Sequence, residues 1–267
     1  MTAIALTIAG SDSGGGAGIQ ADLKTFSALG VYGASAITAL TAQNTRGVDA
    51  VGAVAPALVA AQIEAVLADL DVGAVKIGML PDAATVDIVV GALDGYSGPV
   101  VVDPVMVAKS GDVLSDAGAV AAIRDRLVPR ATLLTPNLPE AGRLLDCPAA
   151  GDEARMEAQG RALRELGAGA VLMKGGHAAG PVCTDLLVTA EQVIRLNAPR
   201  QATGNTHGTG CTLSSAIAAG LARGDALSNA VARAHAYLQQ AIGAADTLCV
   251  GSGTGPVHHF HGIWADG

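Results

Sequence analysis

Short apolar runs rich in β-branched residues alternate with longer stretches rich in Ala and Leu along most of this chain. A strand, a helix and a second strand in succession favour parallel pairing, with the helix crossing one face of the sheet. The alternation therefore predicts an α/β fold, a three-layer α/β/α sandwich with a mostly parallel central sheet. No linker, charge block or long repeat interrupts the sequence, so we expect residues 1–267 to form one domain.

The expected elements follow from apolar spacing and from the glycines and prolines at their ends. Strands are predicted over 3–9, 32–40, 74–77, 99–102, 132–134 and 170–173, with a hairpin over 182–189 and 192–196. Helices are predicted over 17–29, 56–70, 83–93, 116–127, 153–166, 211–222 and 226–242. Ligands of such sheets bind beyond the carboxyl ends of the strands. We therefore expect functional residues directly after the strands.

Composition argues against several classes of partner. The formal net charge is −8, whereas a nucleic-acid partner requires a basic surface, so no nucleic acid is expected. Residues 25–45 and 201–222 lack charged side chains, but both windows carry polar residues and glycines throughout. A transmembrane helix is more continuously apolar, so no membrane partner is expected. The four cysteines are widely spaced, which is typical of a reducing, cytoplasmic location.

The segment Gly208-Thr209-Gly210-Cys211 carries the strongest sign of chemistry, because it leads from a glycine-rich turn into a predicted helix. The first N–H groups of a helix lack internal partners, and the helix dipole adds positive charge there. Such an end binds anions, including a phosphoryl group. A cysteine in the first turn has its thiolate favoured and can act as a base or a nucleophile. The alternative is an ordinary tight turn beside a small buried cysteine.

Three charged residues lie just beyond other predicted strands. Asp103 ends an apolar strand, where its carboxylate can bind Mg²⁺ or form a helix cap or an ion pair. Glu140 lies three residues after Asn137, a spacing that suits either outer-shell binding of a metal–phosphate or a capping box. Lys174 is placed either to reach a nucleotide phosphate or to be a solvated surface lysine. Together with an anion-binding helix end, these residues are what phosphoryl transfer requires.

Two other patterns are weaker. The glycine loop over 10–18 lacks the G-x-G-x-x-G spacing of dinucleotide sites, and the chain has no Gly-Lys pair for a P-loop. A flexible lid, a close approach to ligand or a plain turn remains possible for this loop. His258, His259 and His261 cluster near the end of the chain, where a polar segment is favoured over a three-histidine metal site.

Seven motifs in order resemble the hydroxymethylpyrimidine/phosphomethylpyrimidine kinase family of thiamine biosynthesis, within the ribokinase superfamily. The motifs are Ala9–Ser13, Gly16–Lys24, Thr41–Thr45, Val102–Val105, Lys174–His177, Gly208–Ser215 and Gly255–Phe260. The resemblance covers residues 3 to 261. It implies a ribokinase-like fold, the use of ATP and Mg²⁺, and a cytoplasmic homodimer. The implied substrates are 4-amino-5-hydroxymethyl-2-methylpyrimidine and its monophosphate.

The same resemblance assigns roles to individual residues. Cys211 takes the place of the aspartate base of other ribokinases and forms the catalytic loop with Gly208, Thr209 and Gly210. The residues implied to bind the pyrimidine are Gln43, Gly10, Asp22, Met79 and Val105. Those implied to bind ATP are Lys174, Asn137 and Thr209, and those implied to bind Mg²⁺–phosphate are Asp103 and Glu140.

Two rival functions are considered. A pyridoxal or pyridoxine kinase shares the fold and the Gly-Thr-Gly-Cys loop, and Gln43 and Met79 favour the pyrimidine over the B6 vitamer. A non-catalytic nucleotide or vitamin sensor is expected to have lost Cys211, Asp103 or Lys174, and this chain retains all three.

Overall fold

The computed structural model describes residues 2–107, 111, 114–176 and 180–264. Within these residues nine strands form one sheet in the order β3-β2-β1-β4-β5-β6-β7-β8-β9. The strands are β1 (Ile4–Asp12), β2 (Tyr32–Asn44), β3 (Gly47–Ala53), β4 (Ala74–Ile77), β5 (Val100–Val102), β6 (Leu133–Leu134), β7 (Ala170–Met173), β8 (Val182–Val188) and β9 (Val193–Pro199). The six strands from β2 to β7 in this order pair in parallel, and β3, β8 and β9 pair antiparallel. The predicted mostly parallel sheet and the β8–β9 hairpin are confirmed.

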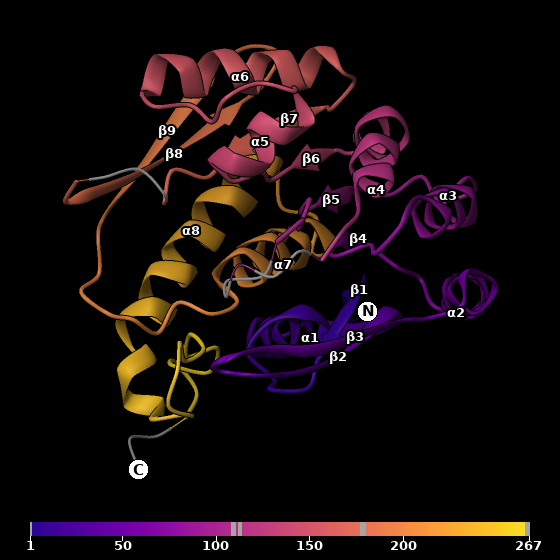
Figure 1. Cartoon of the computed structure of the whole chain (residues 1–267), viewed down its shortest axis with the longest axis horizontal. Coiled ribbons are helices and arrows are strands. Elements are labelled where there is room, and N and C mark those ends of the chain that lie inside the picture. Colours follow the sequence, from indigo (N-terminus) through magenta and orange to yellow (C-terminus); the bar gives the residue numbers. More distant parts are fainter. Residues whose placement is uncertain (1, 108–110, 112–113, 177–179, 265–267) are drawn as a thin grey trace.

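Helices cover both faces of this sheet, which completes the predicted three layers (Figure 1). One face carries α1 (Gly18–Ala28), α7 (Thr209–Ala222) and α8 (Leu227–Gly243). The other carries α2 (Pro56–Asp69), α3 (Ala83–Ala92), α4 (Ala117–Ala122), α5 (Leu138–Leu144) and α6 (Glu153–Glu165). None of the helices in the described ranges is both long and apolar enough to cross a lipid bilayer.

Side-chain size on β1 explains why α7 lies so close to the centre of the sheet. Successive strand residues point to opposite faces. Leu6 and Ile8 pack in the core cluster beneath α2 and α3, whereas the small Ala5 faces the cluster of α1, α7 and α8. Because α7 is itself rich in alanine, its backbone approaches the sheet closely and contacts β1, β4 and β5. The N-terminus of α7 is thereby placed at the centre of the carboxyl edge.

Some element boundaries differ from the predictions. β2 continues to Asn44, so Gln43 lies within a strand rather than after one. β3 was not predicted, because most of its side chains are exposed and its sequence carries no buried alternation. The helix predicted over 116–127 is α4 followed by a π-helical turn at Ile123–Leu127 and a 3₁₀ turn at Val128–Arg130. His177, part of one quoted motif, lies outside the described residues.

Candidate active site

Two glycine-rich loops from opposite ends of the sequence meet at the carboxyl edge of the sheet. Gly208 precedes α7 with a φ of +79°, a left-handed conformation that favours glycine. A Cβ on Gly208 would lie 1.9 Å from the carbonyl oxygen of Gly16, so space also excludes a side chain there. Thr209, the first residue of α7, donates its N–H to the Thr206 carbonyl at 3.4 Å. The loop after β1 therefore packs directly against the predicted catalytic loop.

The Asp12 carboxylate holds the loop that follows β1. It accepts hydrogen bonds from the N–H groups of Gly14, Gly16 and Ala17 at 2.8, 3.0 and 2.8 Å, and His207 Nε2 lies 2.9 Å from its Oδ2. Burial opposes the ionisation of Asp12, but the hydrogen bonds from His207 and the backbone outweigh it and lower its pKa. The loop is thus held to Asp12 and His207 by side-chain hydrogen bonds.

Cys211 is the third residue of α7, and its sulfur accepts a hydrogen bond from the N–H of Gly18, the first residue of α1. The half-buried thiol has a pKa raised to about 11, chiefly by burial. Lys76 and the Gly18 N–H lower this pKa, and the carboxylates of Asp22 and Asp103 raise it. The expectation that the helix end favours a thiolate is wrong for the protein without ligand. Desolvation of the sulfur outweighs the helix dipole there.

Lys174 and Asp103 form an ion pair against the first turn of α7. Lys174 Nζ lies 2.7 Å from Asp103 Oδ1, with side-chain exposures of 14% and 1%. Thr135 and Ser214 also donate to the carboxylate, each at 3.3 Å. A Cβ on Gly210 would lie 3.2 Å from Lys174 Nζ, so the helix end and the ammonium face each other closely. Lys174 is therefore a largely enclosed cation and not a solvated surface lysine.

Glu140 and Asn137 form the capping box that their spacing allows. Glu140 N–H donates to the Asn137 side chain, and Asn137 N–H donates to Glu140 Oε2, each at 2.8 Å. Burial raises the pKa of Glu140 to about 7; Lys174 acts against this rise and Asp103 adds to it. The capping alternative is confirmed, and the same carboxylate lies within the electrostatic reach of the Lys174–Asp103 pair.

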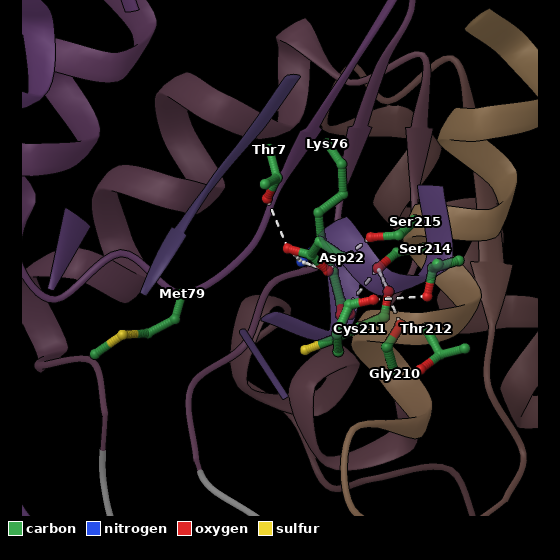
Figure 2. A network of polar contacts seen from close by, with 12 residues as sticks. Thr7, Asp22, Lys76, Met79, Gly210, Cys211, Thr212, Ser214 and Ser215 are labelled. Atoms are coloured by element: carbon green, nitrogen blue, oxygen red, sulfur yellow. Dashed lines mark hydrogen bonds and ion pairs between the residues drawn. The ribbon is translucent and has the colours of Figure 1, made fainter. Parts of the chain in front are cut away.

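Asp22 lies beneath the site and not in an open pocket. Its side chain is fully buried and accepts hydrogen bonds from Thr7 at 2.6 Å, from Ser215 at 2.6 Å and from Lys76 at 2.9 and 3.0 Å (Figure 2). A carboxylate whose oxygens are all bonded within the protein is not exposed to a substrate. The structure therefore does not fit the predicted direct contact of Asp22 with the pyrimidine. Asp22 instead holds its neighbours Thr7, Ser215 and Lys76 in place through these hydrogen bonds.

Gln43 lies next to the two loops. Its Nε2 is 3.3 Å from His207 Nε2, and its Oε1 accepts a hydrogen bond from Thr41 at 3.1 Å. Sequence reasoning missed His207 because its partners Asp12 and Gln43 are 195 and 164 residues away along the chain. No local spacing reveals a contact of that range, although His207 precedes the glycine turn directly.

The other residues expected around a pyrimidine lie along neighbouring strand ends. Gly10 packs against Met79, since a Cβ on Gly10 would lie 2.7 Å from Met79 Sδ. Met79 is buried, and Figure 2 shows it apart from the polar network around Cys211. Val105 is half-buried and donates its N–H to the Asp103 carbonyl at 2.8 Å. Among the described residues, no hydrogen bond joins Gly10, Met79 or Val105 to Gly208–Cys211.

The histidines near the end of the chain are structural. His258 and His259 are buried, and His259 Nε2 lies 3.1 Å from the Thr212 hydroxyl. Burial lowers the pKa of His259 to about 3. These two polar side chains are therefore packed inside the fold. Within the described part of the chain, no group of three or more His, Cys, Asp or Glu residues is arranged to hold a metal ion.

Two hollows lie away from the candidate site. One of about 640 Å³ is lined by residues that include Asp71, Gly73 and Tyr96, near the starts of β4 and β5. The other, of about 310 Å³, lies beside the β8–β9 turn and the start of α8. Neither is lined by Cys211 or Lys174, so neither is the predicted site.

A mostly parallel sheet of this order, covered by helices on both faces and with the N-terminus of α7 at its carboxyl edge, matches the ribokinase-like kinases. The chain belongs to the phosphomethylpyrimidine kinase family, whose model matches residues 12–258. It is 59% identical to the hydroxymethylpyrimidine/phosphomethylpyrimidine kinase of Rhizobium meliloti (strain 1021), over 100% of both chains.

Solved structures agree with this assignment. The phosphomethylpyrimidine kinase of Clostridium difficile 630 is 43% identical, with a TM-score of 0.80 over 90% of this chain and 99% of that one. The pyridoxal kinase of Staphylococcus aureus in complex with AMP-PCP and pyridoxal is 30% identical, with a TM-score of 0.91 over 100% of this chain and 96% of that one.

Proposed function

We propose that this chain transfers the γ-phosphoryl group of ATP to the hydroxymethyl group of 4-amino-5-hydroxymethyl-2-methylpyrimidine, and then phosphorylates that monophosphate to the pyrophosphate, in thiamine biosynthesis. The names of the curated relatives support the substrate. The observation that carries the chemistry is the meeting of Gly210, Lys174 and Asp103 at the N-terminus of α7. A cation and the N–H groups of the first helical turn converge there, as a transferring phosphoryl group requires.

The N–H groups from Gly208 to Cys211 serve as the anion site in this proposal. They belong to a turn that is held rigid by Gly208 and by the packed loop after β1. Donors fixed in advance need no reorganisation when negative charge develops on the phosphoryl oxygens. One such donor contributes roughly 3 kcal/mol of transition-state stabilisation by analogy with oxyanion holes.

Cys211 is the proposed acceptor of the hydroxyl proton. Because the resting thiol has a raised pKa, it first loses its proton to water, and the thiolate then accepts the substrate proton as the oxygen attacks phosphorus. The second acceptor is a phosphate, which is already ionised near neutral pH and needs a base less. Cys211 therefore matters more for the first phosphorylation than for the second.

The family also implies Mg²⁺, and the donor set fits it. Asp103 and Glu140 are two carboxylates that share one cation, Lys174. Mg²⁺ in kinases is held through one or two carboxylates together with phosphates and water, and not by an all-protein cage. Asp103 and Glu140 would hold it in this manner. When bound, Mg²⁺ supplies positive charge to the phosphate oxygens.

Gln43 is the proposed selector for the pyrimidine ring. An amide both donates and accepts, which matches a ring nitrogen beside an exocyclic amine. The contacts of Gln43 with Thr41 and His207 support a fixed orientation of that amide. Gly10, Met79 and Val105 are proposed to line the same pocket from neighbouring strand ends.

The proposed function is tested by product analysis. The protein is incubated with ATP, Mg²⁺ and the pyrimidine alcohol, and the monophosphate and pyrophosphate are identified by mass. Cys211→Ala is expected to reduce the first phosphorylation more than the second, each assayed separately. Equal losses in both steps would contradict the role as a base, and no phosphorylated pyrimidine would contradict the function.

Pyridoxal kinase activity is the second candidate. It is favoured by the close likeness of this fold to a pyridoxal kinase structure that contains pyridoxal. The measurement is kcat/KM for pyridoxal and for the pyrimidine alcohol on the same preparation. We expect the pyrimidine to be the better substrate, and the reverse order would make pyridoxal kinase the main activity.

We further propose that residues 1–267 act as one domain in a cytoplasmic homodimer. The single sheet supports one domain. Tyr32, Leu40 and Val51 expose apolar side chains on the β2–β3 edge of that sheet, which supports an interface there. Light scattering coupled to gel filtration tests this, since a monomer at micromolar concentration would contradict the dimer.

A further inference from the structure

The first two turns of α1 and α7 pack against each other around Cys211 and Asp22. Gly18 and Asp22 are four residues apart on α1, and Cys211 and Ser215 are four residues apart on α7, so each pair shares one helix face. The Gly18 N–H donates to Cys211 Sγ. One turn further along, the Ser215 hydroxyl donates to Asp22 Oδ1 at 2.6 Å. Cys211 and Asp22 therefore lie on the facing sides of the two helices, about one turn apart.

Lys76, from β4, joins Asp22 at this junction, and Figure 2 shows Asp22 between Lys76 and Cys211. Its Nζ is 2.9 and 3.0 Å from the two oxygens of Asp22, and both side chains are 0% exposed. Burying two charges costs several kcal/mol per ion, so such a pair adds little to stability compared with apolar side chains of the same volume. A buried ion pair directly under the proposed base therefore points to a use other than stability.

We propose that Lys76 and Asp22 are positioning residues for Cys211, a buried ion pair whose ammonium balances the thiolate charge and whose carboxylate keeps the resting sulfur protonated.

Four charged groups act on the sulfur, and their signs define the effect. Lys76 and Lys174 attract a thiolate, whereas Asp22 and Asp103 repel it. Lys174 and Asp103 face Gly210, where the proposed phosphoryl and Mg²⁺ sites lie, whereas Lys76 and Asp22 are fully enclosed. Lys76 is therefore the one of the two cations whose charge stays next to the sulfur throughout a turnover.

The Lys76–Asp22 pair serves a proton transfer in which each proton and each bond can be followed. The thiol releases its proton to water, and the thiolate then takes the hydroxyl proton of the substrate. As the S–H bond forms, the substrate oxygen bonds to the γ-phosphorus of ATP, the bond to the β,γ-bridging oxygen breaks and ADP leaves. This consequence for catalysis rests on the proposed function; the effect of Lys76 on the sulfur does not.

The experiment measures alkylation of Cys211 by iodoacetamide, without substrate, from pH 7 to pH 11. Peptide-resolved mass spectrometry gives the rate for Cys211 relative to the exposed Cys147 of the same chain, which serves as the internal reference. An opposite charge a few ångströms away lowers a pKa by about one unit or more. We therefore expect Lys76→Met to slow Cys211 alkylation at pH 8 about tenfold, and Lys76→Arg to restore most of the rate.

Two further variants separate charge from packing. Thr7→Val removes one hydrogen bond to Asp22 without changing any charge, and we expect a rate within about twofold of the parent. If Lys76→Met does not fold, Asp22→Asn/Lys76→Met removes both charges at similar volume. Lys76 acts on the sulfur more strongly than Asp22 does, so this double variant is expected to slow alkylation several-fold.

An unchanged Cys211 rate in both lysine variants would overturn the proposal, and so would a loss with Thr7→Val as large as that with Lys76→Met. Kinetics then test the catalytic consequence. We expect Lys76→Met to lower kcat of the first phosphorylation about tenfold, with a smaller effect on the second. A shifted alkylation profile in a protein that phosphorylates no pyrimidine would refute the proposed function and leave the charge effect on the sulfur standing.

Discussion

Two lysine–aspartate pairs flank the first turn of α7, and they differ in how completely the protein encloses them. Lys76 and Asp22 are both 0% exposed, and Thr7 and Ser215 complete the bonding of the carboxylate. Lys174 is 14% exposed and faces Gly210 at the open edge of the sheet, although its partner Asp103 is as buried as Asp22. Both lysines follow the same pattern in the sequence, at or just after a strand end.

The difference shows how one ion-pair chemistry serves two purposes. A cation with no exposed surface and fully bonded partners is fixed, because moving it would leave two buried charges unpaired. A cation with one open side can contact a phosphate from that side while it stays beside its carboxylate. The inner pair is thus a permanent part of the structure, and the outer pair is available to a ligand.

The largest effect is expected from breaking the inner pair. Lys76→Met leaves the Asp22 carboxylate buried without its cation, which typically costs about 3–5 kcal/mol of folding free energy. Urea unfolding measures the loss, and Asp22→Asn/Lys76→Met is the matched control that removes both charges. We expect the double variant to recover most of the lost stability. Equal stability of the single and double variants would mean that the pair is not held as the structure describes.

Breaking the outer pair is expected to affect activity more than stability. Lys174→Met removes the cation that faces the proposed phosphoryl site, and we expect kcat/KM for ATP to fall about a hundredfold, as when a preorganised donor is lost. Its free energy of unfolding should fall by less than that of Lys76→Met, because Lys174 is 14% exposed and water can enter its place beside the carboxylate, whereas Lys76 is fully enclosed. A larger loss of stability than in Lys76→Met would reverse the comparison.

Gly78 and Gly210 allow a second comparison of the two ion pairs, because Gly78 faces Lys76 and Gly210 faces Lys174. A Cβ on Gly78 would lie 2.7 Å from Lys76 Nζ and 2.9 Å from Ala9 Cβ, whereas a Cβ on Gly210 would lie 3.2 Å from Lys174 Nζ. The methyl group added by Gly78→Ala would collide with an ammonium that cannot move. We therefore expect overpacking to lower the free energy of unfolding by about 1–3 kcal/mol. The methyl group added by Gly210→Ala would contact the Lys174 ammonium, which can move. We therefore expect the free energy of unfolding to fall by less than half as much. Thermal unfolding of the two variants side by side decides this.

The smallest effect is a dependence of stability on pH above 9. The pKa of Cys211 is raised from 9.0 to about 11 by burial in the folded protein. Between these values the unfolded chain loses its thiol proton while the folded chain keeps it, so stability falls as pH rises through this window. Cys211→Ala should flatten the fall relative to the parent in urea unfolding at pH 8.5 and pH 10.5. Parallel losses in both proteins would show that the sulfur titrates at its ordinary value.

Much of the framework was predictable because it depends on local patterns. The alternation of apolar runs sufficed for the layers and for the parallel sheet, and the rule that ligands lie after strands selected Asp103 and Lys174. The turn before α7 was recognisable because Gly208 and Gly210 allow the close approaches seen there. β3 was not predicted because it is an edge strand with mostly exposed side chains, so its sequence does not alternate between buried and exposed residues.

The parts that sequence reasoning missed depend on burial and on distant partners. The helix position of Cys211 indicated a thiolate, but desolvation of its sulfur is visible only when the neighbouring elements are in place. Asp22 and Lys76 are 54 residues apart, so no local spacing indicated that Asp22 would form a buried ion pair. The contact of His207 with Asp12 was hidden for the same reason.

The contact between Gly16 and Gly208 has a consequence for synthesis of the protein. The first of these glycines follows the earliest strand, which becomes a central strand of the sheet, and the second begins the helix that covers it. A nascent chain on the ribosome therefore carries a strand whose covering by α1 is completed by α7 only when residue 222 has emerged. Ribosome-bound intermediates shorter than this are expected to be the form that chaperones protect.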